Sequence, residues 1–314
     1  NNITEKNTNE DSKLSLKVMA DFSEKNPEKL ESLAQSNEEQ IQKLTVSAVE
    51  NATSTKEDAD LIAKVVAEAS DTIINTVIKE VTKNSINKKE ALSARVMKSI
   101  VEINPDKIIN LSEENKDNLI KQTIDAAKNQ NLDKENKGDD LTQVIADIII
   151  DADIETSGDL IKEIDLTELD NESDLNLSII EKLSNKDFYE EKLEIIAIRS
   201  KLNLDAVENL ISKSIKNVET DDKLERVKNI VIKSKGIVSE KIIKAGEKDE
   251  ETKNKVVKIV TKIIEKDPEK AVEILEKNKK TKALSKKIKT KIDKGDAITA
   301  DDFEDVYKYN VSPN

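Results

Sequence analysis

The segment FSEKNPEKLESL, residues 22–33, recurs in altered form as IVEINPDKIINL, residues 100–111, and as IIEKDPEKAVEI, residues 263–274. Three of the four prolines in the chain lie in this setting, each directly after Asn or Asp. An Asn or Asp side chain can cap a helix, and Pro suits the first helical position because its missing N–H would have no partner there. We therefore interpret each segment as a junction between two helices.

The first two junctions belong to a longer internal match. Residues 14–51 align with residues 92–129 at an offset of 78, with fourteen identical positions out of 38. The only two methionines of the chain, Met19 and Met97, fall on one aligned position. Such self-similarity at a fixed interval predicts a repeat architecture.

A degenerate copy of the junction is expected between the second and third. The candidate is SNKDFYEEKL, residues 184–193, in which Asp187-Phe188 stands where Asn-Pro or Asp-Pro stands elsewhere. The steps from Pro27 to Pro105, from there to Phe188 and on to Pro268 are then 78, 83 and 80. Acidic helix starts give a second set of landmarks, ending in Leu61, Leu141, Leu224 and Phe303, with steps of 80, 83 and 79. Both sets predict a repeat of about 80 residues, present nearly four times.

The composition favours short amphipathic helices. Hydrophobic residues make up 36% of the chain and charged residues 37%, with only five glycines and four prolines. We predict an all-α fold, an α-solenoid whose core is one layer thick. The predicted domain covers residues 13–310, in units of about 13–90, 91–175, 176–251 and 252–310; residues 1–12 and 311–314 are predicted tails. A long coiled coil is the structural alternative, but it would not tolerate a proline at a fixed place in each unit.

Low hydrophobicity and a net charge of −13 are also typical of disorder. Apolar stripes at helical spacing argue against that alternative. The stripes are Leu14, Val18 and Phe22; Leu61, Val65 and Ala69; and Val256, Ile259, Val260, Ile263 and Ile264.

Within the first unit we predict helices over about 13–25, 57–69 and 71–81. A helix beginning at Pro27 and another after Ser36 should lie between them, because Ser36 and Glu39 have capping-box spacing.

Charge is distributed unevenly along the chain. Residues 1–205 carry a net charge of −18, and residues 206–300 carry +8. The densest basic run is KNKKTKALSKKIKTKIDK, residues 277–294. It is either a solvated helix face or a site for anionic lipid, nucleic acid or an acidic protein. The candidate contacts are Lys277, Lys279, Lys280, Lys282, Lys286, Lys287, Lys289 and Lys291.

Several classes of function are disfavoured. The chain has three arginines and 2% aromatic residues, which argues against nucleic acid as the main partner. With no His and no Cys, the usual general base, thiol nucleophile and zinc ligands are missing, so we predict no enzyme, cofactor or metal site. The acidic string around Asp151 and Asp153 fails as a calcium loop, because Thr156 and Lys162 stand where Gly and Glu are needed. A helical hydrolase with paired carboxylates is a third alternative.

No apolar run approaches the roughly 18 residues of a membrane span. The chain begins with Asn and has no charged-then-apolar leader, so we expect a processed product or an excised segment.

The closing segment DKGDAITADDFEDVYKYNVSPN, residues 293–314, together with SLKVMADFSEKNPEKL and LSEENKDNLIKQTIDAAKNQ, resembles the helical C-terminal regions of large bacterial proteins that carry a FecR-type domain. The resemblance spans most of the chain and implies a cell-envelope or exported setting, with a cytoplasmic location as the alternative; it gives no site residues. Our leading hypothesis is a non-enzymatic helical-repeat scaffold or spacer for an unidentified protein partner, within a larger protein. The alternative is an electrostatic binding module that uses residues 277–294.

Overall fold

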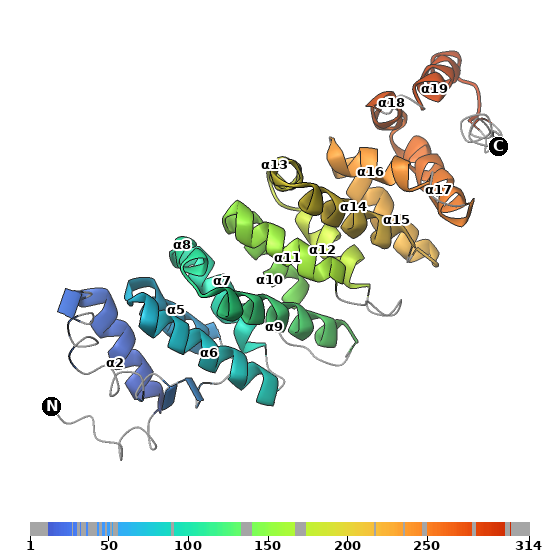
Figure 1. Ribbon diagram of the computed structural model, residues 1–314. Coiled ribbons are helices and arrows are strands. Elements are labelled where there is room, and N and C mark those ends of the chain that lie inside the picture. Colours follow the sequence, from blue (N-terminus) through green and yellow to red (C-terminus); the bar gives the residue numbers. More distant parts are fainter. Residues whose placement is uncertain are drawn as a thin grey trace, which may run out of the picture. The chain divides into compact units, whose positions relative to one another are not determined.

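The computed structural model describes residues 12–26, 28–29, 32, 36, 43, 46–47, 49–50, 52, 56–88, 91–132, 140–166, 174–216, 218–234, 236–246, 250–277, 281–298 and 302. Within these residues the chain forms sixteen α-helices and no β-strand (Figure 1). The predicted all-α class is therefore confirmed. The chain divides into two compact units, residues 1–167 and residues 168–314.

The first unit contains eight of the described helices. They are α2 (Ser12–Lys25), α5 (Lys56–Glu68), α6 (Asp71–Lys88), α7 (Leu92–Ile103), α8 (Asp106–Ile109), α9 (Glu113–Leu132), α10 (Leu141–Asp151) and α11 (Ile154–Leu166). α5 packs against α2 and α7, and α7 packs in turn against α10. On the other side, α9 packs against α6 and α11, and the short α8 contacts α7 and α11. The unit is thus two adjoining rows of short helices.

The second unit contains the other eight described helices. They are α12 (Leu175–Leu183), α13 (Tyr189–Arg199), α14 (Lys201–Lys216), α15 (Asp221–Lys233), α16 (Ile237–Ala245), α17 (Glu250–Lys266), α18 (Pro268–Lys277) and α19 (Lys282–Lys294). α14 packs against α12, α13 and α16, and α17 packs against α15, α16 and α18. α19 packs against α18.

Four helix pairings of the first unit recur in the second. In the first unit, α7 contacts α9 and α10, while α11 contacts α8 and α9. In the second, α12 contacts α14 and α15, while α16 contacts α13 and α14. The five helices from α7 to α11 therefore match the five from α12 to α16 in order and in these four pairings.

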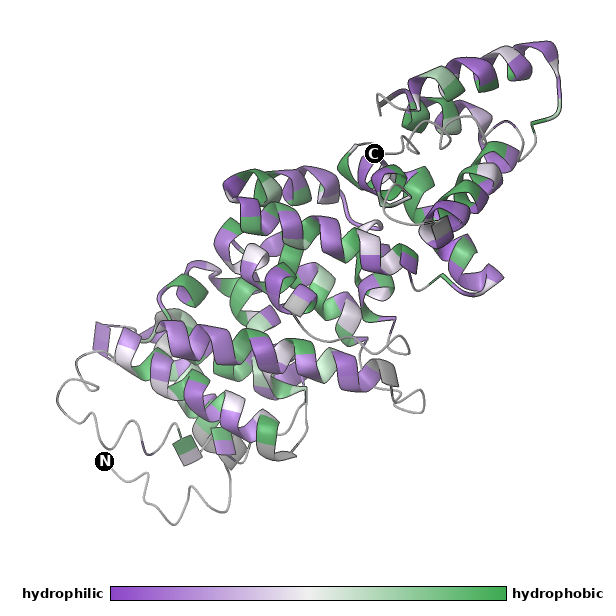
Figure 2. Cartoon of the chain, turned by 45° about the vertical axis from the view of Figure 1, so that its right-hand side comes forward, coloured by the Kyte–Doolittle hydropathy of each residue, from purple (hydrophilic) through white to green (hydrophobic). Residues whose placement is uncertain are grey.

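Most helices bury one side and expose the other, whereas α10 and α12 are buried almost all round. In Figure 2, hydrophobic and hydrophilic residues are interleaved along the helices, as expected for short amphipathic elements. Three helices, α7, α12 and α17, bury apolar residues in the same spacing of i, i+1 and i+4. These residues are Val96, Met97 and Ile100; Ile179, Ile180 and Leu183; and Ile259, Val260 and Ile263.

Side-chain hydrogen bonds also join helices that are neighbours in space but not consecutive in the chain. The Lys107 ammonium donates to the carbonyl of Ala69 (3.2 Å), just after the end of α5. The amide of Asn115 in α9 donates to the side-chain oxygen of Asn75 in α6 (2.9 Å). Because the acceptors are a backbone carbonyl and a side-chain amide, these bonds fix the register of neighbouring helices without burying an ion pair.

The predicted junctions coincide with helix starts. Pro268 is the first residue of α18, and the Lys270 N–H donates to the Asp267 carboxylate (2.9 Å), so the predicted cap is confirmed. Pro105 has helical angles, φ −60° and ψ −29°, but it is the N-cap of α8 and not its first helical residue. No side chain caps α8 and Asn104 ends α7, so the cap predicted at this junction is wrong. Phe188 directly precedes α13 but has a left-handed φ of 58°, which a proline cannot adopt. Pro27 lies outside the described residues.

Two local predictions for the first unit need correction. The helix over 13–25 is confirmed as α2, but Val18 is 40% exposed. The buried positions are instead Leu16, Met19 and Ala20, because α5 covers a neighbouring stripe of α2. Ser36 is itself helical and its hydroxyl donates to the Ser32 carbonyl (2.8 Å), which is the bond of a residue inside a helix and not of an N-cap.

Candidate functional site

The predicted basic segment falls on two helices. Lys277 is the last residue of α18, and α19 carries the five lysines at positions 282, 286, 287, 289 and 291. Lys279 and Lys280 lie outside the described residues. α19 buries Leu284, Ser285 and Ile288 against the rest of the unit. The structure therefore brings most of the predicted lysines onto one amphipathic helix.

Two of these lysines already bind a carboxylate of the same chain. Asp302 is 4% exposed and pairs with Lys287 (3.3 Å) and Lys291 (2.6 Å). The Lys291 ammonium also donates to the carbonyl of Ala297 (3.1 Å). Sequence reasoning treated all the lysines alike, because the pairing depends on how the chain after α19 returns to it.

Another three lysines form a separate face. Lys282, Lys286 and Lys289 are spaced by four and three positions, so they share one side of α19, and all three are exposed. They make no ion pair within the described part of the chain. We call residues 282, 286 and 289 the lysine face. They are the part of the predicted anion-binding site on α19 that is not already paired with a carboxylate of the chain.

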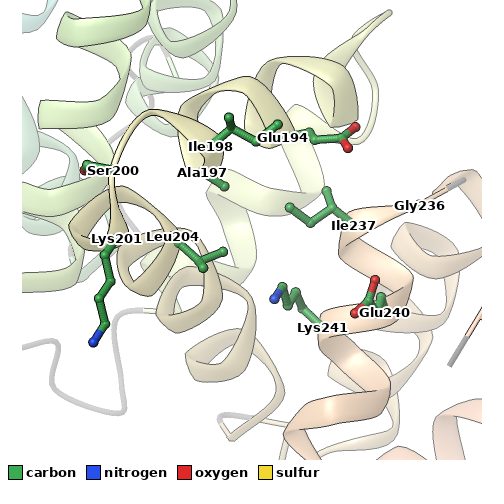
Figure 3. Close-up of a pocket in the computed structure, with 10 residues that line it drawn as sticks. All are labelled: Glu194, Ala197, Ile198, Ser200, Lys201, Leu204, Gly236, Ile237, Glu240 and Lys241. Atoms are coloured by element: carbon green, nitrogen blue, oxygen red, sulfur yellow. The ribbon is translucent and has the colours of Figure 1, made fainter. Parts of the chain in front are cut away.

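A groove of about 700 Å³ lies in the second unit between α13 and α16 (Figure 3). Ala197 and Ile198 line it from α13, Leu204 from α14 and Ile237 from α16. Glu194 stands at its edge. The groove is therefore lined by both apolar and charged side chains.

The wall of the groove is held by Glu190, a buried carboxylate from α13. The Gly236 N–H donates to Glu190 Oε2 (2.8 Å), and the Val238 N–H donates to Glu190 Oε1 (3.2 Å). Glu190 thus caps the N-terminus of α16 from another helix, where a negative charge is favoured by the helix dipole. This cap could not be found from local sequence, because the Glu lies 46 residues before the first N–H that it accepts.

Tyr189 joins α13 to the end of α15. Its hydroxyl is hydrogen-bonded to Ser234 Oγ, which also donates to the Ile230 carbonyl (2.8 Å). Burial raises the pKa of Tyr189 well above its ordinary value, and the bond to Ser234 offsets only part of that effect. Tyr189 is therefore a structural residue here, and its phenol is neutral at physiological pH.

The charged groups of α16 that line the groove are engaged in ion pairs. Lys241 pairs with Glu208 of α14, and Glu240 pairs with Lys244 one turn along (3.0 Å). The hydrogen bond from Lys244 to Glu240 is the largest cause of the raised pKa of Lys244. Both charged side chains that α16 contributes to the groove therefore have a partner within the chain.

Beside the groove lies an exposed apolar strip that sequence reasoning missed. Phe188 is 78% exposed, Ile195 46%, Ile198 75% and Leu202 61%. These four are half of the large hydrophobic residues exposed in the described chain, and they fall within 15 positions. We call Phe188, Ile195, Ile198 and Leu202 the α13 strip. The sequence did not reveal this strip, because charged residues alternate with its apolar residues and the resulting pattern resembles that of an ordinary polar helix face.

A smaller cavity of about 280 Å³ lies in the first unit between α5, α7 and α10. Lys98 contributes to its polar lining and pairs with Asp147 (3.0 Å) and Glu102 (3.6 Å). Burial alone would lower the pKa of Lys98, but the two carboxylates outweigh burial and hold that pKa above its ordinary value. Ser99, which also lines the cavity, donates to Asp60 (2.7 Å). Polar side-chain contacts around this cavity therefore join α7 to both α5 and α10.

The acidic string that was tested as a calcium loop has a structural role. Asp153 Oδ1 accepts from the N–H groups of Glu155 (2.8 Å) and Thr156 (2.9 Å), so it caps α11. Glu155 and Asp159 bind Lys116 of α9 (2.9 and 2.8 Å). Over the residues that the structure describes, no group of three His, Cys, Asp or Glu side chains could hold a metal ion.

Comparisons with known proteins do not assign the chain to a family. No family model, no curated protein and no solved structure matches the chain. In the described part of the chain, none of the helices combines the length and hydropathy of a membrane span.

Proposed function

We propose that the chain is a non-enzymatic helical-repeat scaffold or spacer that presents its helix faces to a protein partner. We further propose that its helices form an α-solenoid of about four units of roughly 80 residues, within a larger envelope-associated or exported protein.

One observation carries this proposal, namely the recurrence of helix order and helix pairing. The starts of α7, α8 and α11, at positions 92, 106 and 154, recur at an offset of 83 as the starts of α12, α13 and α16, at positions 175, 189 and 237. Four pairings among α7–α11 recur among α12–α16. A repeat in which each helix touches only its near neighbours supports a stacked architecture.

The surfaces also favour binding over catalysis. The sequence supplies neither His nor Cys. Apolar residues line much of the groove between α13 and α16, the charged residues that α16 contributes to it are ion-paired, and an exposed apolar strip lies beside it. Such surfaces are typical of protein–protein contact.

Small-angle scattering tests the architecture. A single compact domain of 314 residues would have a radius of gyration of about 20 Å. We expect a clearly larger value for a stack of repeats. A radius of gyration equal to that of the compact domain, with helical circular dichroism intact, would refute the solenoid.

The setting is tested separately. Fractionation of the native cells, followed with an antibody against this chain, should place the protein in the envelope or the medium. Recovery in the cytoplasm would remove the proposal that came from the resemblance to FecR-domain proteins.

The second candidate function is electrostatic binding through the lysine face of α19. It is favoured by the exposure of Lys282, Lys286 and Lys289. Lys287 and Lys291 already pair with a carboxylate of the same chain, so fewer lysines of α19 are free to bind a partner.

Binding to vesicles that contain anionic lipid tests this candidate. Retention should fall when the three lysines of the lysine face are changed together to Glu. The charge-matched control changes three exposed lysines of the first unit to Glu, namely Lys17, Lys64 and Lys79. Equal retention of the two triple variants would eliminate the candidate.

A further inference from the structure

We propose that the α13 strip is a homodimer interface, on which a second copy of this chain packs its own α13 in the antiparallel direction. This inference names one partner for the proposed scaffold and rests on that proposal. The juxtaposition that carries it is an exposed apolar strip flanked by acidic residues at its start and basic residues at its end.

The strip is large enough to matter. Its four side chains expose roughly 400–500 Å² of apolar surface, which is in the range of patches that mark interaction sites. Ile195 and Ile198 are three positions apart and share one face of α13, and Phe188 directly precedes the helix. Leu202 follows in the first turn of α14. Solvating such a strip is unfavourable unless something covers it.

The backbone at the start of the strip is also unusual. Phe188 has a φ of 58°, and it is one of only two non-glycine residues with positive φ in the described chain. A bulky residue held in this region is strained, and such positions concentrate at functional sites. Here the conformation leaves an aromatic ring 78% exposed, where burial would normally be favoured.

The charges point to a second copy as the occupant. Glu191 and Glu194 lie in the first half of α13, whereas Arg199 ends the helix and Lys201 begins α14. All four are exposed, and none makes an ion pair within the residues that the structure describes. Two parallel copies would place like charges together, while antiparallel copies place the acidic half of each against the basic half of the other.

The pattern is close to symmetric about Ile195. In an antiparallel pair with its two-fold axis at Ile195, helix positions equally far from that residue lie level with each other. Glu191 then lies level with Arg199 of the second copy, and Phe188 lies at the end where α14 of the second copy begins, near its Leu202. Ile195 meets itself. A face that is complementary to its own copy is what a two-fold interface requires.

The expected complex is weak. Two strips would bury roughly 1,000 Å² of apolar surface together, near the lower limit for a specific interface. We therefore expect a dissociation constant on the order of micromolar, with association that weakens as salt screens the charged ends.

Cross-linking at the two-fold axis gives the sharpest test. The chain has no Cys, so Ile195→Cys introduces the only thiol. The matched control is Ile86→Cys, at a position of α6 in the first unit that is 58% exposed, compared with 46% for Ile195. With a short bis-maleimide, I195C should give a covalent dimer at least tenfold faster than I86C. Equal rates would overturn the proposal.

Charge exchange gives the second test, by sedimentation velocity on the full chain. E191R and R199E should each weaken the dimer about tenfold, because each places like charges level across the axis. The double variant E191R/R199E should restore the affinity to within about threefold. A double variant weaker than either single change would overturn the pairing.

A wild-type chain that stays monomeric at about 100 µM would overturn the interface altogether, since this is about a hundred times the expected dissociation constant. Circular dichroism should be unchanged in every variant, because all the substituted side chains are exposed. A chain that is monomeric and has a large radius of gyration would refute the dimer but not the extended scaffold. A dimer whose subunits have the radius of gyration of a compact domain would refute the extended scaffold but not the dimer.

Discussion

Glu190 offers the clearest test of how the second unit is held together. Its carboxylate is 8% exposed and accepts from two backbone N–H groups, those of Gly236 and Val238. Glu190→Ala would leave both donors without this partner at the start of α16, and water cannot readily reach the buried Val238. The helix would also lose the negative charge that favours its N-terminus.

The magnitude follows from the number of bonds. A hydrogen bond to a charged group contributes about 1.5–3 kcal/mol, and loss of an N-cap alone costs about 1 kcal/mol. The two bonds share one carboxylate and one helix end, so their losses are not additive. We expect Glu190→Ala to destabilise the second unit by about 3 kcal/mol. Glu190→Gln keeps an acceptor for one N–H and should cost about half as much.

Chemical denaturation followed by circular dichroism measures the loss, and amide hydrogen exchange locates it. Protection at Gly236, Val238 and the following turn of α16 should fall by at least tenfold in the Ala variant. The control is Asp205→Ala, an exposed acid of α14 outside the α13 strip, which should change stability by less than about 0.5 kcal/mol. If E190A and D205A unfold alike, the Glu190 carboxylate does not hold α16.

Three further changes test other parts of the molecule. Met97→Ala removes a fully buried side chain of α7 and should cost about 2–4 kcal/mol by denaturation, whereas Val18→Ala on the exposed side of α2 should cost far less. Lys116→Met should destabilise the α9–α11 contact by about 1–2 kcal/mol, because Glu155 and Asp159 lose the ammonium that they share and Asp159 keeps only Lys162 (3.3 Å). Burial lowers the pKa of Lys116 but its two carboxylate partners raise it more, so the folded pKa lies above 10.5 and this contribution should disappear only as pH rises through it. Burial, followed by repulsion from acids of α9, raises the pKa of Glu163 despite the nearby Lys121. The ionised Glu163 is therefore less favourable in the folded state than in the unfolded state. Glu163→Gln should raise the free energy of unfolding at pH 7 by up to about 0.5 kcal/mol, but not at pH 3, where Glu163 is protonated in both states. Denaturation at the two pH values measures this difference.

The parts of the fold that sequence reasoning recovered are those set by neighbouring residues. The cap at Asp267 and the first helical proline at Pro268 depend on three or four consecutive residues, and both were predicted correctly. The helix starts near positions 13, 57 and 71 follow from apolar spacing in the same way, and the structure begins them within one position. Local chemistry was sufficient because short helices are delimited by their own ends.

The parts that sequence reasoning missed depend on partners far along the chain. Val18 belongs to a regular apolar stripe, but the partner helix α5 covers a different side of α2. Asp302 reduces the predicted basic site only because the chain brings it back to Lys287 and Lys291. Glu190 is one of many acids in the sequence, and nothing beside it indicates a bond to α16. Charge and spacing predicted which elements form, whereas the site depends on which faces meet.

Several hydrogen bonds between helices span similar lengths of chain. The bonds from Lys107 to Ala69 and from Asn115 to Asn75 span 38 and 40 residues, and those from Gly236 and Val238 to Glu190 span 46 and 48 residues. Each interval is about half of the proposed repeat, as expected for contacts between successive helix pairs. If contacts of this length carry the stability, a defect should weaken only adjoining helices. The exchange experiment on Glu190→Ala therefore has a second readout: amides of α13, α14, α17 and α18, the helices that contact α16, should lose protection, while those of α5–α9 in the first unit should keep theirs.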